Sequence, residues 1–492
     1  MEYPWLLILP RLIPIIFGGL MPVLHITDYH KRNLYVMCVV SVTSVLILVV
    51  NFWGPSGSLV LGGFGSKMSI GFKIDDLSRL FSFMLAILWP LASVYAFGYM
   101  RHDKYEMRFY AFYTVSYGIT LAIAYSANFL TIHLFYELLT LVTLPLVIHN
   151  MNKEAFAAGR KYIYYSIGGA ALIFICLAFL VYYGDTLDFR LGGVFSGSMV
   201  EEYRPQILQA FTIAFVGVGV KAALFPLHGW LPSASVAPVT VTALLHAVAV
   251  VKSGAFVAMR LTYYLFDIEL LWGTWAQYTV MGLTIITILY GSARAFYTSQ
   301  LKLRLAYSTV SQLSYTLFAI TLMTWKGLAA AMMYMLAHGF IKILLFYCCG
   351  SVLHVTHRYE ISELGGLGRR MPITFATFTI GALALMGLPL TAGFTAKFQL
   401  LSAATQGGSL LATGGVVVIF IAVLLSAAYL FPVIRTAYFP KQGEVLPDEE
   451  HAPHDPGLYI TVPLRIIAGL VVVIGIAGGP LLNWISSFMG GG

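Results

Sequence analysis

Four lysines stand inside long apolar stretches of the sequence, where a charge is costly. They are Lys221, Lys252, Lys342 and Lys397. A charged side chain at the centre of a bilayer costs roughly 2.5–3.5 kcal/mol on insertion scales. A desolvated lysine can release its proton, whereas arginine stays charged. One such lysine could be a structural anchor to a neighbouring carbonyl or carboxylate, but a row of four favours proton or cation transfer.

One glutamate and several histidines accompany these lysines. Glu137, in HLFYELLTLVTLP, lies well inside an apolar run and is the natural counter-ion of a lysine such as Lys221. A Glu–Lys pair keeps the lysine protonated, and separating the pair lets the proton leave. His133 precedes Glu137 by four residues and so shares its helix face. It could tune the carboxylate or be a satisfied core histidine, and both interpretations stay open.

Two further histidines are spaced for a relay. His246 precedes Lys252 by six residues, so we expect the two to point to different sides, one back toward Lys221 and one onward. His338 and Lys342, in LAHGFIK, are four apart and share a face. Histidine titrates near neutrality and can receive and pass protons. His228, in FPLHGWLP, is interpreted as structural.

The overall composition predicts a membrane protein. Of the 492 residues, 59% are hydrophobic and 10% are charged, with a mean hydropathy of +0.83. A soluble domain carries about 25% charged residues. No soluble domain remains to hold a redox cofactor or nucleotide, so we expect no cofactor, no metal site and no redox catalysis by this chain alone. The four cysteines are expected to be buried free thiols, and the net charge of +8 is spread over loops rather than forming a nucleic-acid surface.

About fourteen apolar runs are each long enough to cross a bilayer as a helix. The first is interpreted as a retained span rather than a signal peptide. With the N-terminus outside, sixteen Lys and Arg, Lys302 among them, fall in inside loops, and six, Arg260 among them, fall in outside loops. The positive-inside rule then places both termini on the outer or periplasmic side of the cell inner (cytoplasmic) membrane. Arg11, Arg79 and Arg465 lie nearer span ends and are expected to snorkel to the headgroups.

Two stretches are expected to be broken helices. They are GVGVKAALFPLHGWLP, with Pro226 and Pro232, and ALMGLPLTAGFTAKF, with Gly387, Pro389 and Gly393. Proline removes a ladder hydrogen bond and frees a carbonyl, and paired broken helices in the two halves of a transporter mark its ion path. We therefore expect an all-α membrane fold with two inverted five-helix repeats. The expected division is residues 1–107 (three helices), 108–262 (first repeat), 272–438 (second repeat) and 439–492 (inside loop and final helix). The segment QGEVLPDEEHAPHDP is interpreted as a solvated inside loop.

Several segments resemble the antiporter-like subunits shared by respiratory complex I, Mrp-type Na⁺/H⁺ antiporters and membrane-bound hydrogenases. They are KAALFPLHGWLPSASVAPVTVTALLHA, LKLRLAYSTVSQLSYTL, LAHGFIKILLF and ELGGLGRRMPITFATFTIGALALMGLPLTAGFTAKFQLL, and the likeness begins near FKIDDLSRLF. The resemblance implies fourteen spans, two inverted repeats and membrane subunits as partners. It also implies ion-translocating roles for Glu137, Lys221, His246, Lys252, His338, Lys342 and Lys397.

The sequence departs from the family pattern at two positions. Ser233 and Gln300 stand where the family often has aspartate, so an acidic funnel at the inside surface is in doubt. No long lateral helix is expected after the last span, which favours a protein of the Mrp D-like or hydrogenase-complex type over the distal member of complex I.

The hypothesis from sequence is a proton (or Na⁺) translocating subunit of a multisubunit membrane complex. Water would reach the Glu137–Lys221 pair, and the proton would pass through the histidines and lysines to leave near Lys397. The alternatives are a stand-alone cation/proton antiporter and a non-transporting scaffold for an oxidoreductase arm. Partners that co-purify in mild detergent would separate a subunit from a carrier.

Overall fold

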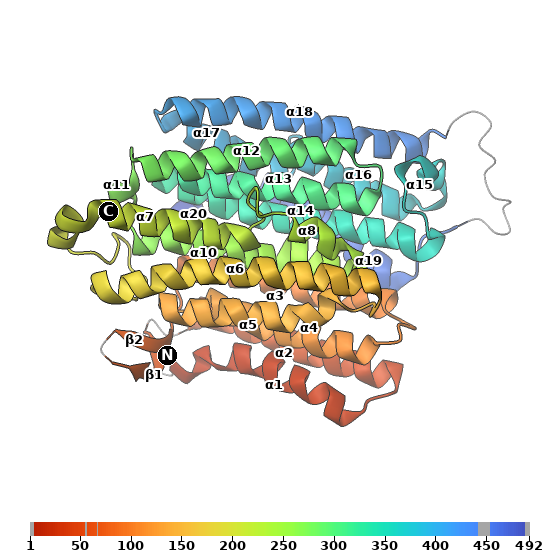
Figure 1. The fold of residues 1–492 in the computed structure, drawn as a ribbon. Coiled ribbons are helices and arrows are strands. Elements are labelled where there is room, and N and C mark those ends of the chain that lie inside the picture. The colour runs from red at the N-terminus through yellow and green to blue at the C-terminus, as the bar shows by residue number, and fades with distance from the viewer. Residues whose placement is uncertain (1–3, 55–56, 66, 441–452, 488–492) are drawn as a thin grey trace.

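A computed structural model of the chain describes residues 4–54, 57–65, 67–440 and 453–487. Within these residues, helices fill fourteen passes that lie side by side in one bundle (Figure 1). The first half contains α1 (Leu9–Leu24), α2 (Tyr29–Trp53), α3 (Asp76–Tyr99), α4 (Glu106–Ala124), α5 (Phe129–Val147), α6 (Lys153–Tyr183), α7 (Gly197–Lys221) with α8 (Trp230–Ser233), and a pass built from α9 (Val239–Ala243), a π-helix (Leu244–Val248), α10 (Val250–Arg260) and a second π-helix (Leu261–Leu265). The second half contains α12 (Trp275–Tyr297), α13 (Leu301–Thr321), α14 (Trp325–Thr356), α16 (Pro372–Met386) with α17 (Ala392–Gln406), α18 (Leu410–Tyr438) and α19 (Leu458–Ile476) with α20 (Gly478–Ser487). The short helices α11 (Ile268–Leu271) and α15 (Leu367–Arg370) lie in loops, and the 3-10 turns are Pro4–Leu7, Ala234–Val236 and Ile361–Leu364.

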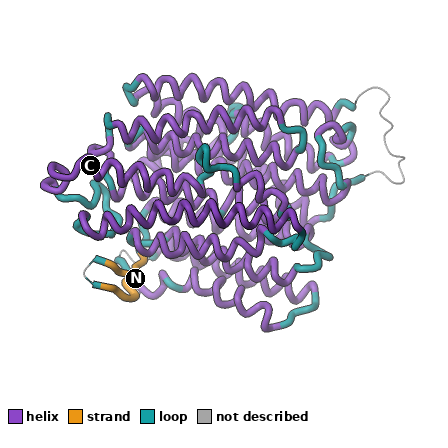
Figure 2. The backbone as a smooth tube through the Cα atoms, in the orientation of Figure 1, coloured by secondary structure: helices purple, strands orange, loops and turns teal. Residues whose placement is uncertain are grey.

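The loops gather at two opposite ends of this bundle (Figure 2). One, the hairpin end, carries the antiparallel strands β1 (Leu59–Phe64) and β2 (Met68–Phe72). The other, the basic end, carries the loops at 100–105, 148–152, 298–300 and 357–371. The first described turn and α20 both lie toward the hairpin end. This alternation is the one that the spacing of the apolar runs predicts.

Side-chain caps start many of the passes. The N-cap residue accepts a hydrogen bond from the backbone N–H three residues on, which satisfies one of the donors left free at a helix start. The capping residues are Asp28, Asp75, Asn128, Asn152, Thr274, Thr324 and Ser409. Each helix therefore begins at a defined residue, which fixes the height of the side chains along it.

The two predicted breaks are present. α7 ends at Lys221, and residues 222–229 form turns before α8 begins. α16 ends at Met386, where Gly387 takes φ +93°, and α17 begins at Ala392. At the second break the backbones come very close, because a Cβ built on Gly393 would lie 1.8 Å from the Ala384 carbonyl oxygen. Glycine is required there.

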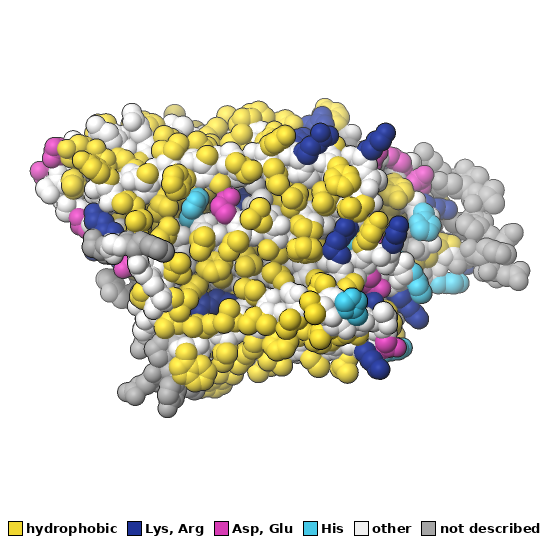
Figure 3. Space-filling view, turned by 60° about the horizontal axis from the view of Figure 1, so that its bottom comes forward, with side chains coloured by type: hydrophobic (Ala, Val, Ile, Leu, Met, Phe, Trp, Pro, Cys, Tyr) yellow, Lys and Arg dark blue, Asp and Glu magenta, His cyan; other side chains and the backbone are white. Residues whose placement is uncertain are grey.

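The surface fits a bilayer. Of the described helices, nine are long and apolar enough to cross a membrane by length and composition. Hydrophobic side chains cover most of the middle of the face in Figure 3, and charged side chains gather mainly toward the ends. The chain is an all-α multi-pass membrane protein, as its composition predicts.

Several expectations for single residues were wrong. Arg11 does not snorkel: it is buried, and its guanidinium lies 3.4 Å from the centroid of the Phe72 ring. Arg260, counted as an outside-loop charge, is buried at the end of α10. Cys38 is exposed, whereas the other three cysteines are buried free thiols. Most of the predicted acidic loop, residues 441–452, lies outside the described residues.

Candidate functional site

Lys221 and Glu137 meet in the middle of the bundle. Lys221 is the last residue of α7, and Glu137 lies midway along α5. Lys221 Nζ is 3.9 Å from Glu137 Oε1, and it donates a hydrogen bond to the Tyr136 carbonyl oxygen. The Tyr136 ring lies against the same ammonium, 3.4 Å from centroid to Nζ. The lysine is fully buried, whereas the Glu137 side chain is 31% exposed, so the carboxylate is the partner nearer the surface of the chain.

The break in α7 joins this pair to the next helix. The Val220 carbonyl oxygen at the break accepts two hydrogen bonds, one from Trp230 Nε1 at 2.7 Å and one from the Ala223 N–H at 3.1 Å. A Cβ on Gly254 of α10 would lie 2.7 Å from the Ala222 backbone nitrogen. Glycine at this position lets α10 press against the end of α7. Lys221 and Lys252 therefore lie on two helices in direct contact.

Lys252 and His338 form the second close pair. Lys252 lies near the middle of the α9–α10 pass and is hydrogen-bonded through Nζ to His338 Nδ1 of α14. Both residues are fully buried. The other ring nitrogen of His338, Nε2, has no hydrogen-bond partner among the described residues. His338 can therefore pass a proton through its ring, taking it at one nitrogen and releasing it at the other.

His246 lies between α14 and the residues that follow the break in α7. Its ring packs against Phe346 of α14 at 4.9 Å, and its Nε2 lies 3.5 Å from Ser235 Oγ. His246 itself lies in the π-helix Leu244–Val248, where one extra residue is inserted into the helical turn. His246 and Lys252 thus both face α14, with His246 nearer the basic end.

Lys342 follows His338 by one helical turn on α14. Its ammonium donates to the Leu305 carbonyl oxygen at 3.1 Å and to Ser308 Oγ, both on α13. Lys342 is therefore held by neutral oxygens, with no carboxylate among its hydrogen-bond partners in the described part of the chain.

Lys397 lies beside the second break. Its Nζ donates to the carbonyl oxygens of Leu385 at 2.5 Å and Met386 at 3.1 Å, at the end of α16. The helix stops at Met386, so these two carbonyls have no continuing backbone turn to bind. The predicted link between a broken helix and its lysine is present, and the lysine caps the break.

A small cavity, lined mainly by apolar side chains, lies between these two parts of the row. Its volume is about 10 Å³, near the lower limit for one water molecule. His338, Gln312, Tyr334 and Leu385 line it, and Tyr334 donates a hydrogen bond to Gln312 Oε1. His338 and Leu385, whose carbonyl oxygen binds Lys397, therefore border the same space.

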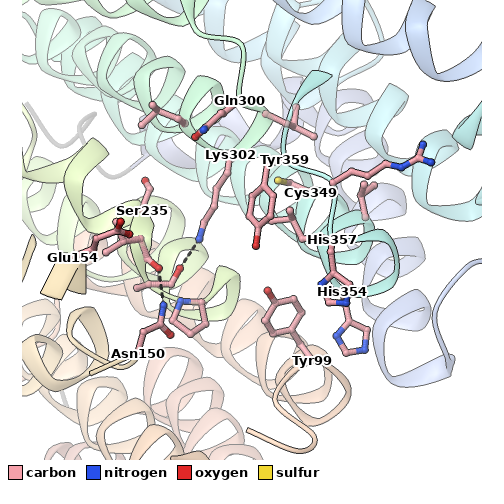
Figure 4. Close-up of a pocket in the computed structure, with 18 of the residues that line it drawn as sticks. Tyr99, Asn150, Glu154, Ser235, Gln300, Lys302, Cys349, His354, His357 and Tyr359 are labelled. Carbon is pink, nitrogen blue, oxygen red and sulfur yellow. Dashed lines mark hydrogen bonds between the residues drawn. The ribbon is translucent and has the colours of Figure 1, made fainter. Parts of the chain in front are cut away.

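A large cavity opens at the basic end (Figure 4). Its volume is about 770 Å³. Lys302 reaches into it from α13 and donates a hydrogen bond to the Ala237 carbonyl oxygen. Ser235 lies in the wall, and behind it is His246. The cavity thus gives the buried row a polar approach from the basic end, and Lys302 stands beside it.

Acidic side chains are present at this surface, although Ser233 and Gln300 stand where the family often has aspartate. Asp103 and Glu154 line the cavity together with Gln300. Burial by itself raises the pKa of the Asp103 carboxyl, but hydrogen bonds from His149 Nε2 (2.8 Å) and from the Tyr105 N–H hold that pKa below its usual range. Asp103 is therefore a carboxylate at neutral pH.

The sequence interpretation missed two sets of residues. Lys302 was taken for a topological loop charge, and Asp75 with Arg260 was not linked at all. No signal in LKLRLAYST separates Lys302 from a topological charge, because it lies at the very start of α13. His133 packs on Phe174 with a ring distance of 6.0 Å, and His228 on Tyr290 at 4.6 Å. No hydrogen bond joins His133 to Glu137 in the described structure.

Comparisons with known proteins agree with this architecture. Residues 126–426 match the family model described as NADH:quinone oxidoreductase/Mrp antiporter, TM. Residues 62–110 match the model of the N-terminus of chain 5 of NADH-ubiquinone oxidoreductase (complex I). Among curated relatives, NAD(P)H-quinone oxidoreductase chain 5 of Picosynechococcus sp. is 29% identical over 86% of this chain and 66% of its own length. NADH-quinone oxidoreductase subunit L of Rickettsia bellii is 30% identical over 85% and 64%. The chain thus spans about two thirds of the length of these relatives.

Two solved structures share the fold. A chain of an archaeal membrane-bound sulfane sulfur reductase superposes with a TM-score of 0.84, 22% identity and coverage of 97% of this chain and 96% of the other. A chain of the Mrp complex from Dietzia sp. DQ12-45-1b gives a TM-score of 0.83, 19% identity and coverage of 99% and 97%. The larger family match covers more than half of the sequence, so this chain belongs to the family of transmembrane subunits shared by NADH:quinone oxidoreductases and Mrp antiporters.

Proposed function

We propose that this chain is a proton (or Na⁺) translocating subunit of a multisubunit membrane complex. The observation that carries the proposal is the row of buried ionisable groups, with Glu137 beside Lys221 and Lys252 bound to His338. Relatives named as subunits of quinone oxidoreductases, and neighbours from a reductase complex and an Mrp complex, support membrane subunits as partners.

In this proposal the ion moves along the middle of the bundle. Glu137, Lys221, His246, Lys252, His338, Lys342 and Lys397 carry the charge in turn. The 770 Å³ cavity supports an approach from the basic end through Ser235 to His246, in addition to the Glu137–Lys221 pair. The 10 Å³ cavity supports transfer by one water between His338 and Lys397.

Electrostatics supply the coupling. Two unit charges separated by roughly 10 Å in an effective dielectric of about 20 interact by about 1.7 kcal/mol. A change of that size alters the population of a neighbouring charged state by more than tenfold. Moving Glu137 relative to Lys221 would therefore bias Lys252, and the bias would continue to Lys342 and Lys397. Partner subunits would supply the movement.

We further propose that the chain lies in the inner (cytoplasmic) membrane with its basic end inside and both termini outside. The excess of Lys and Arg in loops at the basic end supports this orientation. The proposed repeats are residues 108–262 and 272–438. The order of five passes with the fourth one broken, found in each range, supports them.

The test replaces Lys221 in the native assembly, purified and reconstituted into liposomes, with a pH-sensitive dye reporting proton uptake. Lys221→Ala should lower coupled transport by at least about 100-fold, the range for removal of a positioned proton-transfer group. Lys221→Arg should fail equally, because arginine keeps its charge and cannot release the proton. The matched control is Lys326→Ala, an exposed lysine bound to Gln406, which should transport normally.

The outcomes separate the mechanisms. Normal transport in an assembled Lys221→Ala complex would contradict the proposal. Full rescue by Lys221→Arg would show that a fixed charge is needed there rather than a transferable proton.

A further inference from the structure

A second charged cavity lies at the hairpin end. Its volume is about 330 Å³. Four charged residues line it, Lys73, Asp75, Asp76 and Arg190, together with Leu328 and Met332 of α14. Because α14 also carries His338 and Lys342, this cavity shares a helix with the buried row. The proposed ion path gives no role to the residues that line this cavity.

An ion pair joins Asp75 of the cavity lining to Arg260 of α10. The guanidinium of Arg260 binds both carboxylate oxygens of Asp75, one at 2.7 Å, and donates to Ser78 Oγ at 2.9 Å. Arg260 is 1% exposed, whereas Asp75 is 23% exposed. The carboxylate therefore meets the cavity, and the positive charge lies behind it, inside the protein.

Arg260 lies on the same helix as Lys252 of the buried row. It follows Lys252 by eight residues on α10, a rise of about 12 Å in an α-helix. Met332 precedes His338 by six residues on α14, a rise of about 9 Å. Arg260 and Met332 therefore lie about 10 Å from the Lys252–His338 pair, measured along the helix axes.

Two aromatic side chains lie between the Lys252–His338 pair and Arg260. Phe81 of α3 stacks on Phe256 of α10 with a ring distance of 5.0 Å, and both are fully buried. Phe256 also touches the guanidinium of Arg260, 5.2 Å from its ring centroid. Apolar constrictions stop conduction by excluding water, and a fixed arginine repels protons and cations. The two barriers lie in series between the row and the cavity.

We propose that the Asp75–Arg260 pair is the gate between the ion path and the hairpin end. This inference rests on the proposed function. In the closed state Asp75 is paired and Arg260 blocks the approach. A proton that arrives through a transient water chain binds the Asp75 carboxylate, which frees it from Arg260, and is then released to cavity water so that the pair reforms. The positive charge of Arg260 keeps a second proton from following.

A purely structural pair makes different predictions. Breaking a buried pair by removing one partner leaves an uncompensated charge, whereas removing both charges can leave stability unchanged. A structural pair would therefore affect assembly, with no change in the passive proton permeability of complexes that assemble. A gate would change that permeability even where assembly is normal.

The experiment measures passive proton flux in liposomes that contain the whole assembly, driven by a valinomycin potassium potential. Replacing both charges, with D75N and R260M together, should raise the leak about tenfold, because the arginine barrier is gone. D75N alone should show no leak and should lose coupled transport, since Arg260 then lacks its counter-ion. Asparagine still caps helices well, so α3 should keep its start.

The matched control is Asp76, the next residue, which lines the same cavity and pairs with Arg79 at 2.8 Å in an exposed position. D76N should leave both leak and transport unchanged. Adding Lys252→Met to the double variant should abolish the leak, since the leak must pass along the row. If that double variant does not assemble, D75N/R260Q, which also removes both charges but lets the two amide side chains hydrogen-bond, should still raise the leak measurably.

An assembled D75N/R260M complex, or an assembled D75N/R260Q complex in its place, with the leak of the unaltered protein would overturn the gate. Lys221→Ala is measured in the same preparation. Loss of transport in Lys221→Ala with no leak in the gate variants would reject the gate and leave the proposed function standing. Normal transport in Lys221→Ala would reject the proposed function itself.

Discussion

The lysines of this bundle are held mainly by neutral oxygens of the backbone. The Tyr136 carbonyl holds Lys221, the Leu305 carbonyl holds Lys342, and two carbonyls at the end of α16 hold Lys397. Lys302 follows the same rule with Ala237. A carbonyl can accept a hydrogen bond from the charged and from the neutral amine, so these contacts leave the lysines free to change state.

Lys302 gives the prediction at the residue scale. Lys302→Met should slow proton uptake from the basic end by roughly tenfold, the effect of about 1.4 kcal/mol on a barrier, since the charge beside Ser235 and His246 is lost. Initial rates of dye quenching in inverted vesicles measure this. Arg358→Met is the control, because Arg358 lines the same cavity but binds the Glu363 carbonyl away from His246. Equal rates in both variants would remove Lys302 from the path.

The residue types were predictable from sequence, but several of their neighbours were not. An isolated lysine or glutamate in an apolar run stands out, which is why Glu137 and the four lysines were found. Lys302 did not stand out, because it lies where a loop turns into α13 and counts equally well as a topological charge. Arg260 was misplaced for the same reason, since its partner Asp75 is far away in sequence and only the fold brings them together.

At the scale of elements, breaks and bulges decide which way the side chains point. The breaks after Lys221 and Met386 could be predicted, because proline and glycine mark them in the sequence. The π-helix at Leu244–Val248 has no such mark, since its residues are ordinary helix formers. The six-residue spacing of His246 and Lys252 was therefore interpreted on a regular α-helix, and which of the two faces Lys221 stays a prediction.

Gly393→Ala tests the second break. The new Cβ would meet the Ala384 carbonyl at 1.8 Å, so α17 must move away from α16. Overpacking of this kind costs about 1–3 kcal/mol or more. We expect a clearly lower midpoint of thermal unfolding in detergent. We also expect slower transport, because Lys397 loses its hydrogen bonds to the carbonyl oxygens of Leu385 and Met386.

Gly282→Ala is the matched control on α12. A Cβ there meets nothing within 4 Å, and alanine favours a helix over glycine by about 1 kcal/mol. The unfolding midpoint of this variant should stay the same or rise. A Gly393→Ala protein as stable as the control would show that the break can open without cost.

At the scale of the whole molecule, loops alternate between two ends, and this much followed from span lengths alone. The two cavities could not be predicted, because each is lined by residues from distant parts of the chain. Asp103 and Gln300, for example, meet in the basic-end cavity only when the first and second halves are packed together. Composition predicts the membrane fold, whereas the approaches to its interior depend on packing.

Single cysteines test the proposed orientation. Lys153 lies exposed at the basic end and Ser198 at the hairpin end. In a background with Cys38→Ser, a membrane-impermeant maleimide added to whole cells should label Ser198→Cys but not Lys153→Cys. Inverted vesicles should give the opposite pattern. Labelling of Lys153→Cys in whole cells would reverse the orientation and, with it, the direction assigned to each cavity.

The hydrogen bonds from the lysines to backbone carbonyl oxygens have a spectroscopic consequence. A carbonyl that accepts from an ammonium group is polarised more strongly than one that accepts from a neutral amine, so its stretching vibration shifts to lower frequency when the lysine gains a proton. Carbon-13 placed in the backbone carbonyl of Leu385 would move that band away from the rest of the protein. The break in α16 thereby provides a built-in optical reporter, which would follow the charge on Lys397 during turnover without altering any side chain.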